Sequence, residues 1–411
     1  MSKHPWSRRA FLGCSAACGA LVVGRALVPG RAVWSTLAYA GEPAGGKLAE
    51  LIREAPVARW WVSTAAAECA ACHQPGELAA GAQPVHKKTL VRCRLCAREC
   101  LIKDGERGMC GARIHVGGEL KSLVYGRPIS VHVDPIEKKP FYHFLPGSAA
   151  LSLATSGCPL RCQFCQNWEI SQARPEDHPV GFVPPGNVVR AAVERAAPVI
   201  AFTYNEPTVF AEYLLDIARA GKPAGRRAVL VSCGYMNEAP LTEMIAALDA
   251  IKIDLKGYGP EFYRNVSRAE IAPVLRSIRQ IAKAGRHLEI VNLVVPTLND
   301  APASLTELSK WVAGEVGPDV PVHFTRFHPD YQLTNLPPTP VATLERARDI
   351  ALAAGVRFAY VGNVPGHPGN HTYCPGCGAK VIERDGFLVA EVRLHDGKCA
   401  ACRREIPGVW S

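Results

Sequence analysis

Seven short apolar stretches alternate with helical patterns between residues 148 and 364, and this alternation restricts the fold more than any other feature. The apolar stretches are Ala149–Thr155, Val199–Tyr204, Ala228–Ser232, Ala250–Asp254, Leu288–Val295, Val320–Phe324 and Phe358–Val361. The helical patterns include Asn187–Ala196, Thr208–Ala220, Leu241–Leu248, Ala272–Ala284 and Leu305–Val316. Such alternation predicts parallel βαβ units, and polar residues at the ends of the strands are expected to meet at one edge.

The loop after the first of these strands carries Cys158, Cys162 and Cys165 in a C-x3-C-x2-C pattern. A cubane iron–sulfur cluster normally takes four cysteines, so three leave one iron with an open position. An open position on a metal favours chemistry over scaffolding, by the logic that separates catalytic from structural zinc. The alternative without a catalytic role is an ordinary zinc knuckle.

Further motifs follow in order along the chain. They are Val133-Asp134-Pro135-Ile136-Glu137-Lys138-Lys139-Pro140 with Phe144-Leu145-Pro146-Gly147, Gln166-Asn167-Trp168-Glu169-Ile170-Ser171, Thr203-Tyr204-Asn205-Glu206-Pro207, Lys252-Ile253-Asp254-Leu255-Lys256-Gly257 and Ile406-Pro407-Gly408-Val409-Trp410. With them, residues 90–411 resemble the radical S-adenosylmethionine (SAM) enzymes. The resemblance is to the glycyl-radical activating enzymes, such as those of pyruvate formate-lyase, and in particular to the AmmeMemoRadiSam system radical SAM enzymes.

The resemblance implies an α/β fold, a partial (β/α)6 TIM-type barrel, and a [4Fe-4S] cluster whose open iron binds SAM. A low-potential electron donor then allows reductive SAM cleavage to a 5′-deoxyadenosyl radical, which takes hydrogen from a substrate. It further implies Asn167 near the SAM carboxylate, Glu206 at the amino group, Asp254 in a monovalent cation site, Lys256 facing the carboxylate, and His328 as a late-strand histidine. Side-chain alternation also puts Asp254 and Lys256 on one side of their strand.

Two stretches depart from the pattern of the activating enzymes. Tyr204-Asn205 stands where they have two glycines, so the backbone there must approach SAM in another way. Val291-Asn292 occupies the stretch where they carry an arginine, which puts that contact in doubt.

Two further cysteine sets flank the predicted barrel of residues 148–365. Cys374, Cys377, Cys399 and Cys402 form C-x2-C-x21-C-x2-C, which predicts a zinc-ribbon-like module over residues 366–411, with a second cluster as the alternative. Cys93, Cys96, Cys100 and Cys110 form a compact set in a module over residues 86–147. Their spacing suits zinc or an auxiliary cluster and does not separate the two.

The first 85 residues carry separate signals. Ser7-Arg8-Arg9 before an apolar stretch predicts a twin-arginine signal segment over residues 1–40, too interrupted by charge to be a permanent membrane span. Residues 41–85 are expected to be a linker or lead-in, and Cys69-Ala70-Ala71-Cys72-His73 within them matches the c-type haem motif. The signal indicates export to the periplasm, whereas SAM chemistry indicates the cytoplasm, so localisation stays open.

Composition limits the function classes. The chain has 411 residues, a formal net charge of +10 and 16 cysteines, which fall in clusters as metal ligands do. The densest basic run, Lys87 to Lys103, has no interleaved aromatics and does not favour nucleic-acid binding. The main hypothesis is a radical SAM enzyme of activating-enzyme type, and the alternative is an exported iron–sulfur or haem electron carrier. Candidate partners are a protein substrate or Memo- and AMMECR-type proteins. The substrate is not determined by the sequence.

Overall fold

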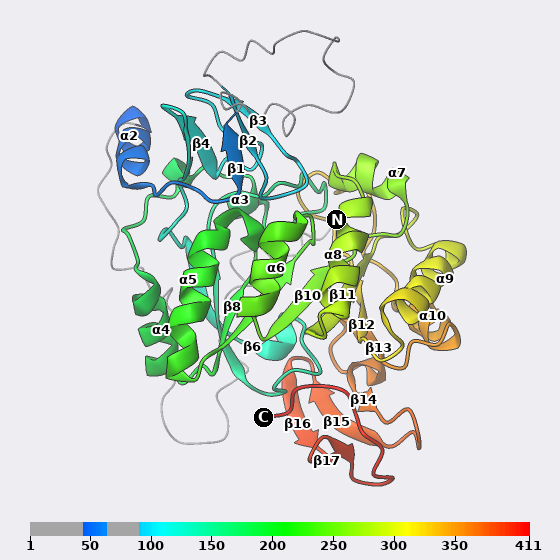
Figure 1. Cartoon of the computed structure of the whole chain (residues 1–411). Helices are drawn as coiled ribbons and strands as arrows, with labels where there is room; N and C mark the ends of the chain where they lie inside the picture. The colour runs from blue at the N-terminus through cyan, green and yellow to red at the C-terminus, as the bar shows by residue number, and fades with distance from the viewer. Residues whose placement is uncertain (1–43, 64–89) are drawn as a thin grey trace, which may run out of the picture.

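The computed structural model of the chain describes residues 44–63 and 90–411. Its centre is an eight-stranded sheet in the order β13-β12-β11-β10-β9-β8-β7-β6 (Figure 1). The strands are β6 Ser130–Pro135, β7 Ala149–Ala154, β8 Val199–Phe202, β9 Arg227–Ser232, β10 Ala250–Asp254, β11 His287–Val294, β12 Val322–Arg326 and β13 Ala359–Gly362. All neighbours pair in parallel except β6 and β7, which are antiparallel.

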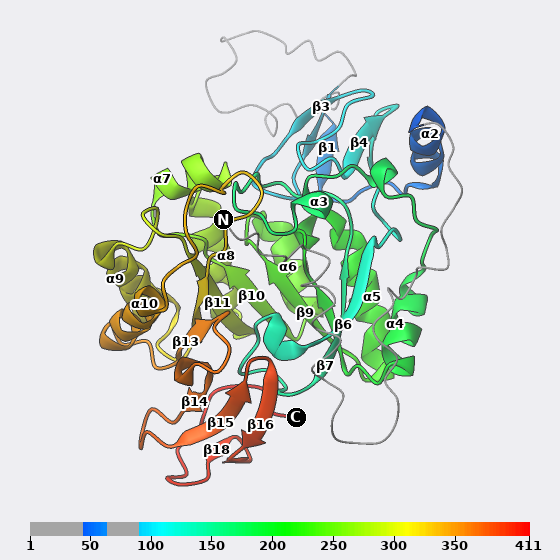
Figure 2. The same ribbon diagram turned by 180° about the vertical axis from the view of Figure 1, so that it is seen from behind.

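The order of the parallel strands in the sheet is their order in the chain. Because crossover connections between parallel strands are right-handed, such an order puts every connecting helix on the same face. Figure 1 shows the helices in front of the sheet, and Figure 2 shows the uncovered face from behind. The helices are α4 Pro185–Glu194, α5 Ala211–Gly221, α6 Glu238–Ala247, α8 Ala272–Lys283, α9 Pro302–Trp311 and α10 Val341–Ala353.

Shorter helical pieces lie in the connections. They are α3 Trp168–Ser171, α7 Pro260–Phe262, the 3-10 turns Ile136–Lys138, Pro175–Asp177, Pro207–Phe210, Lys222–Ala224 and Pro368–Asn370, and the π-helical turns Tyr263–Ser267 and Val312–Val316.

Side-chain alternation divides each strand between the two faces. In β10, Ile251 and Ile253 are fully buried in the main apolar core, which also contains Leu214 of α5 and Ile278 of α8. The residues between and after them, Lys252 and Asp254, therefore lie on the face that the helices leave uncovered. This division gives the sheet an apolar outer layer and a mixed inner face, which carries Lys252 and Asp254 as well as a second apolar cluster that includes Ala150, Val199 and Val229.

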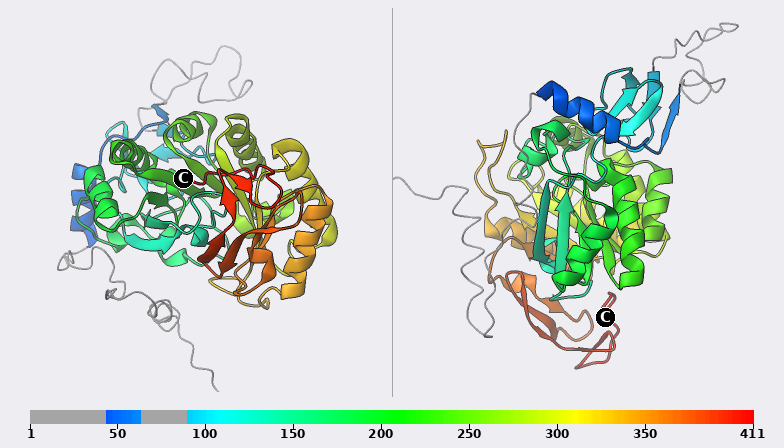
Figure 3. Two further views of the ribbon diagram at one scale, coloured as in Figure 1. Left: turned by 90° about the horizontal axis from the view of Figure 1, so that it is seen from below. Right: turned by 90° about the vertical axis from the view of Figure 1, so that its left-hand side faces the viewer.

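Two small modules lie at opposite ends of the sheet (Figure 3). The N-terminal module lies at the carboxyl end of the strands, and Cys96 forms a bridge with Met236, which follows β9. Its elements are α2 Ala44–Glu54, β1 Trp61–Ser63, β2 Leu90–Cys93, β3 Leu101–Lys103, β4 Arg113–Val116 and β5 Glu119–Ser122. The C-terminal module lies at the other end and comprises β14 Thr372–Tyr373, β15 Lys380–Asp385, β16 Leu388–Val392, β17 Leu394–His395 and β18 Lys398–Cys399.

A buried polar network attaches the C-terminal module to the sheet. Glu289, fully buried in β11, accepts hydrogen bonds from the backbone amides of Tyr142 (2.9 Å) and His143 (2.8 Å), and its Oε2 lies 2.6 Å from His323 Nε2. Arg384 of β15 donates to the Tyr142 carbonyl oxygen at 2.7 Å and lies over the Tyr142 ring. The Tyr142 segment therefore joins the sheet on one side and the module on the other.

His143 is neutral in this network. Burial lowers its pKa to about 4, so the proton on one ring nitrogen must be placed by the hydrogen bonds. Nδ1 lies 2.6 Å from the Pro407 carbonyl oxygen, which can only accept, so Nδ1 donates. Nε2 then accepts from the Tyr360 hydroxyl at 2.6 Å.

The predicted alternation and the parallel sheet of mixed α/β type are confirmed. The sheet described here is open, with β13 and β6 at its edges, and the partial barrel stays a prediction. Within residues 41–85, expected to be a linker or lead-in, the described part forms α2 and β1, and β1 pairs with β2. The signal segment and the Cys69–His73 motif lie outside the described residues. No helix of the described part is long and apolar enough to cross a membrane.

We expect Glu289→Gln to destabilise the fold by about 3 kcal/mol or more, since removing one charge of a buried hydrogen-bonded network leaves its partners unpaired. The glutamine amide would also direct a donor at two backbone N–H groups or at the histidine rings. Thermal and chemical denaturation followed by circular dichroism would measure the change. The matched control is Glu391→Gln on the exposed side of β16, which should leave the transition unchanged. Equal effects of the two substitutions would contradict the role of the network.

Candidate active site

The three-cysteine loop follows β7 at the carboxyl edge of the sheet, and backbone hydrogen bonds hold it from both sides. The Arg161 and Gln163 amides donate to the carbonyls of Ser267 (3.2 Å) and Val266 (3.0 Å), and the Gly157 amide donates to Ile170 (3.0 Å). Asn205 Nδ2 donates to the Gly157 carbonyl oxygen at 2.8 Å. The loop is therefore fixed by the residues of neighbouring elements, as a site that must hold a metal requires.

Gly157 cannot be exchanged for another residue without moving a second cysteine loop. Its φ is +95°, which disfavours side chains. A Cβ at this position would lie 2.3 Å from the Cys110 carbonyl oxygen. The loop of Cys158 and the loop of Cys110 therefore touch through their backbones.

Burial makes Cys158 and Cys162 weak acids in the absence of a metal. It raises the pKa of Cys162 to about 11 although Lys256 nearby lowers it, and it raises the pKa of Cys158 well above its usual value, with Glu206, Cys162 and Cys165 adding to the effect. The three sulfurs thus lie close enough to influence one another. Their loop contains no fourth cysteine. These residues fit a cluster held by three thiolates, since thiolate is the ligand that iron–sulfur clusters take.

Asn167 and Glu206 lie beside this loop in different environments. Asn167 is exposed, and its Nδ2 donates to the Tyr204 carbonyl oxygen at 2.8 Å. Glu206 is only 2% exposed. Its Oε1 accepts from Thr208 Oγ1 (2.6 Å) and Ser232 Oγ (2.8 Å), and its Oε2 from the Cys233 amide (2.7 Å). Both carboxylate oxygens of Glu206 already have partners, so this side chain fixes the ends of β8 and β9.

Tyr204 adopts the backbone conformation that a glycine would favour. Its φ is +70°, in the left-handed region, where a side chain costs about 1–2 kcal/mol. The Tyr204 hydroxyl donates to Asp134 of β6, and the ammonium group of Lys139 binds the same carboxylate. These contacts hold Tyr204 in place, and they explain how the chain keeps a glycine-type turn without a glycine.

Asp254 at the end of β10 lies between two lysines. Lys256 Nζ is 3.3 Å from Asp254 Oδ2, and Lys252 Nζ binds Oδ1. Burial acts to raise the pKa of Asp254, but the two ammonium groups outweigh it and lower that pKa. Burial likewise acts to lower the pKa of Lys256, and Asp254 and Cys162 raise it well above its usual value. Because two cations already neutralise Asp254, it offers little to a monovalent metal ion.

The remaining expected site residue, His328, follows β12 and is exposed, with Nδ1 3.0 Å from the Pro329 carbonyl oxygen. Asn292, in the stretch where an arginine was missing, donates to the Leu255 carbonyl oxygen at 2.8 Å and so supports the β10 end. Cys233 is buried.

Sequence reasoning missed the charged groups that accompany these residues on the inner face. Lys252 shares its side of β10 with Asp254 and Lys256, so the same alternation could have found it. Burial lowers the pKa of Lys139 to about 8, partly offset by Asp134. Neither Lys139 nor Tyr204 was assigned a contact; their common partner Asp134 is 5 residues from Lys139 but 70 residues from Tyr204, and only the pairing of the strands brings Tyr204 to it.

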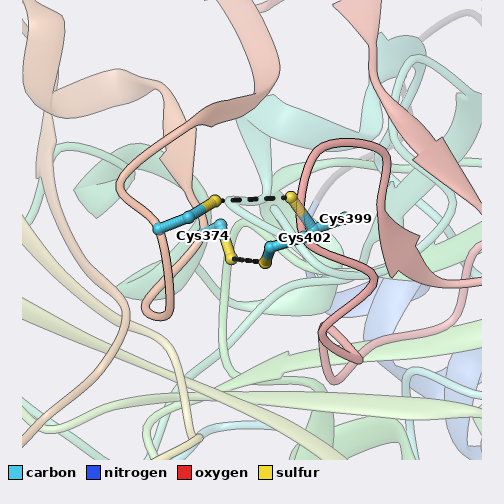
Figure 4. Close-up of side chains that lie close together, drawn as sticks. Cys374, Cys399 and Cys402 are labelled. Atoms are coloured by element: carbon cyan, nitrogen blue, oxygen red, sulfur yellow. Dashed lines mark hydrogen bonds between the residues drawn. The ribbon is translucent and has the colours of Figure 1, made fainter.

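The C-terminal cysteines converge in the described structure (Figure 4). Their four sulfurs lie within 4.8 Å of one another, with Cys374 and Cys402 3.5 Å apart and Cys377 and Cys399 3.8 Å apart. A tetrahedron of Zn–S bonds has edges of about 3.8 Å. The set can therefore hold one metal ion in a closed shell.

Comparisons with known proteins agree with this geometry. Residues 152–308 match the family described as the Radical SAM superfamily. The chain is 42% identical over 318 residues to the uncharacterized protein MJ0808 of Methanocaldococcus jannaschii, covering 77% of this chain and 95% of that protein. It is 24% identical over 165 residues to a pyruvate formate-lyase-activating enzyme of Listeria monocytogenes, covering 38% of this chain and 66% of that enzyme.

Among solved structures, a radical SAM methyltransferase of Sphaerobacter thermophilus is 17% identical, with a TM-score of 0.43 over 53% of this chain and 67% of that one. The match to the superfamily covers the strand that precedes the three-cysteine loop, the loop itself and the Asp254 strand end. From this match, the chain contains a radical SAM domain over residues 152–308.

Proposed function

We propose that the chain binds a [4Fe-4S] cluster through Cys158, Cys162 and Cys165 and cleaves SAM reductively. The observation that carries the proposal is the three-thiol loop, held rigidly at the carboxyl edge of the parallel sheet, with Lys256 close to Cys162. When bound, the cluster supplies one electron from a low-potential donor, which splits SAM into methionine and a 5′-deoxyadenosyl radical that takes one hydrogen atom from the substrate.

The chain's own residues bind and orient SAM in this proposal. Asn167 is exposed beside the loop, and in this proposal its amide exchanges the hydrogen bond to the Tyr204 carbonyl oxygen for one to the methionine part of SAM. Lys256 provides a positive charge for the carboxylate, and His328 lies exposed at the end of β12. Glu206 acts as a positioning residue, because its oxygens hold Ser232 and the Cys233 amide.

The activating-enzyme character and membership of the AmmeMemoRadiSam branch are parts of the same proposal. They rest on the ordered motifs from Asp134 to Trp410 and on the similarity to the Listeria enzyme. The proposal includes a low-potential electron donor, and a protein substrate or Memo- and AMMECR-type proteins as partners.

Replacement of Cys158, Cys162 or Cys165 by serine is expected to abolish formation of 5′-deoxyadenosine, because each serine removes one of three cluster ligands. Each variant is reconstituted anaerobically, reduced with dithionite and assayed with SAM by chromatography. Cys377→Ser, in the C-terminal set at the opposite end of the sheet, serves as the cysteine control: it should lose zinc and thermal stability but still form 5′-deoxyadenosine when assayed below its unfolding temperature. Undiminished 5′-deoxyadenosine from any of the three variants would refute the cluster assignment.

Lys256→Met should weaken SAM binding by about tenfold or more, since a hydrogen bond to a charged group contributes about 1.5–3 kcal/mol. Equilibrium titration of the reconstituted protein with SAM, followed by the change in the cluster's electron paramagnetic resonance (EPR) signal, measures the effect. The control is Lys310→Met, an exposed lysine in the last turn of α9. Unchanged SAM affinity in Lys256→Met would remove Lys256 from the proposed site.

For the C-terminal set we propose one structural zinc ion. Purified protein should contain about one zinc per chain, and Cys374→Ala should lose it together with thermal stability, because a closed tetrathiolate site contributes to folding. Metal analysis by mass spectrometry and a thermal scan test this, with Cys233→Ala as the control for loss of a buried thiol. Loss of iron instead of zinc in Cys374→Ala would make the site a cluster.

A further inference from the structure

The four N-terminal cysteines line one cavity that the proposed function does not use. Cys93, Cys96, Cys100 and Cys110 all line it. Apolar side chains complete most of the wall, among them buried Leu95, Ile102 and Val209. Four cysteines thus line one largely apolar cavity.

The spacing of these sulfurs differs from that of the C-terminal set. Among the described residues, the C-terminal cysteines are the one cysteine group with all sulfurs within 4.8 Å of one another. The N-terminal thiols share a cavity without converging on a single point. A single zinc ion needs sulfurs about 3.8 Å apart, whereas the ligands of a cubane cluster attach to four different irons around a larger body. Four cysteines spread around one cavity suit the four irons of a cluster better than they suit one ion.

A buried cation beside the cavity has an unused donor. Arg113 is 1% exposed and lines the cavity. Its Nη1 donates to the Arg59 carbonyl oxygen at 2.7 Å and its Nη2 to Glu212, while its Nε has no partner. Buried N–H groups without a partner are rare and costly, so this donor points to an acceptor that the protein atoms do not provide. The sulfurs of an anionic cluster would supply one.

The cavity also shares a wall with the catalytic loop. Pro159, which follows Cys158, lines it, and Arg98 Nε donates to the Pro159 carbonyl oxygen at 2.9 Å. On the other side, the Cys110 carbonyl oxygen packs against Gly157. Thr208, which hydrogen-bonds Glu206, is a further part of the wall. A group in this cavity lies directly beside the residues that hold the catalytic cluster.

We propose that Cys93, Cys96, Cys100 and Cys110 hold a second [4Fe-4S] cluster, and that this cluster exchanges one electron with the catalytic one. In that exchange a low-potential one-electron donor reduces the second cluster from the 2+ to the 1+ state. The second cluster returns to 2+ as the catalytic cluster goes from 2+ to 1+. Cluster binding at this site is independent of the proposed function, whereas the electron exchange depends on it.

The test uses the full chain, reconstituted anaerobically with iron and sulfide. Wild type should bind about eight irons, and the combined variant Cys158→Ser, Cys162→Ser, Cys165→Ser should keep about four, because each cubane holds four. On reduction with dithionite the combined variant should show a cluster EPR signal that SAM does not change. No iron in this variant, with zinc in its place, would overturn the proposal.

A reciprocal variant covers the case in which the combined variant does not fold. Cys96→Ser with Cys110→Ser should lose about half of the iron and keep a signal that SAM changes, with circular dichroism as the check on folding. Iron content equal to wild type would overturn the second site. Iron of about four per chain in wild type, all responsive to SAM, would leave the proposed function standing and refute this inference alone.

EPR spectroscopy also tests whether the two proposed clusters lie close together. Two reduced clusters in neighbouring loops interact magnetically, so the EPR spectrum of fully reduced wild type should be broader than the sum of the spectra of the two variants. A spectrum equal to that sum would contradict electron exchange between adjacent clusters.

Discussion

The parallel pairing of β7 to β13 is the constraint on which the rest of the molecule depends. Because these strands run in one direction, their carboxyl ends all reach the same edge of the sheet. The three-cysteine loop, Glu206 and Asp254 come from the ends of β7, β8 and β10, and the pairing alone brings them together. The helices cover only the opposite face, so Lys252 and Asp254 lie on the face that no connecting helix covers.

Because the strands run in one direction, the two cysteine modules lie at chemically different ends of the sheet. The C-terminal set lies at the amino ends of the strands, attached through Glu289 and Arg384, and its four sulfurs close around one point. Such a site can affect the other end of the sheet only by stabilising the fold. The N-terminal set lies against the reactive loop, where Gly157 lets two cysteine loops touch. The position of the C-terminal set therefore suits a structural role, and the N-terminal set lies beside the proposed catalytic loop.

The sequence was sufficient for the seven parallel strands, because each is a short apolar run bounded by polar residues, and period and length suffice to recognise it. It did not predict β6 or its antiparallel pairing with β7. It was not sufficient for α2, whose Ala/Gly-rich sequence has few apolar side chains. The contacts of α2 join residues that lie far apart in the sequence: Glu54 pairs with Arg127, and the Ile52 carbonyl oxygen accepts from Lys121. Nor could it show that Glu206 is enclosed by its own neighbours, since Ser232 and Cys233 arrive there only through the pairing of β8 with β9.

Charge pairing on the inner face decides what kind of ligand this edge can take. Lys252 and Lys256 share the single carboxylate of Asp254, so one positive charge in this group has no partner of its own. Asp134 is already bound by Lys139 and by the Tyr204 hydroxyl, and Glu206 is enclosed, so neither carboxylate can neutralise it. Burying an uncompensated charge is costly, and an anionic group beside Lys256 would remove that cost. The carboxylate of an amino-acid-like ligand such as SAM meets this requirement, and it places that end of the ligand beside Cys162, where the proposed cluster would receive it.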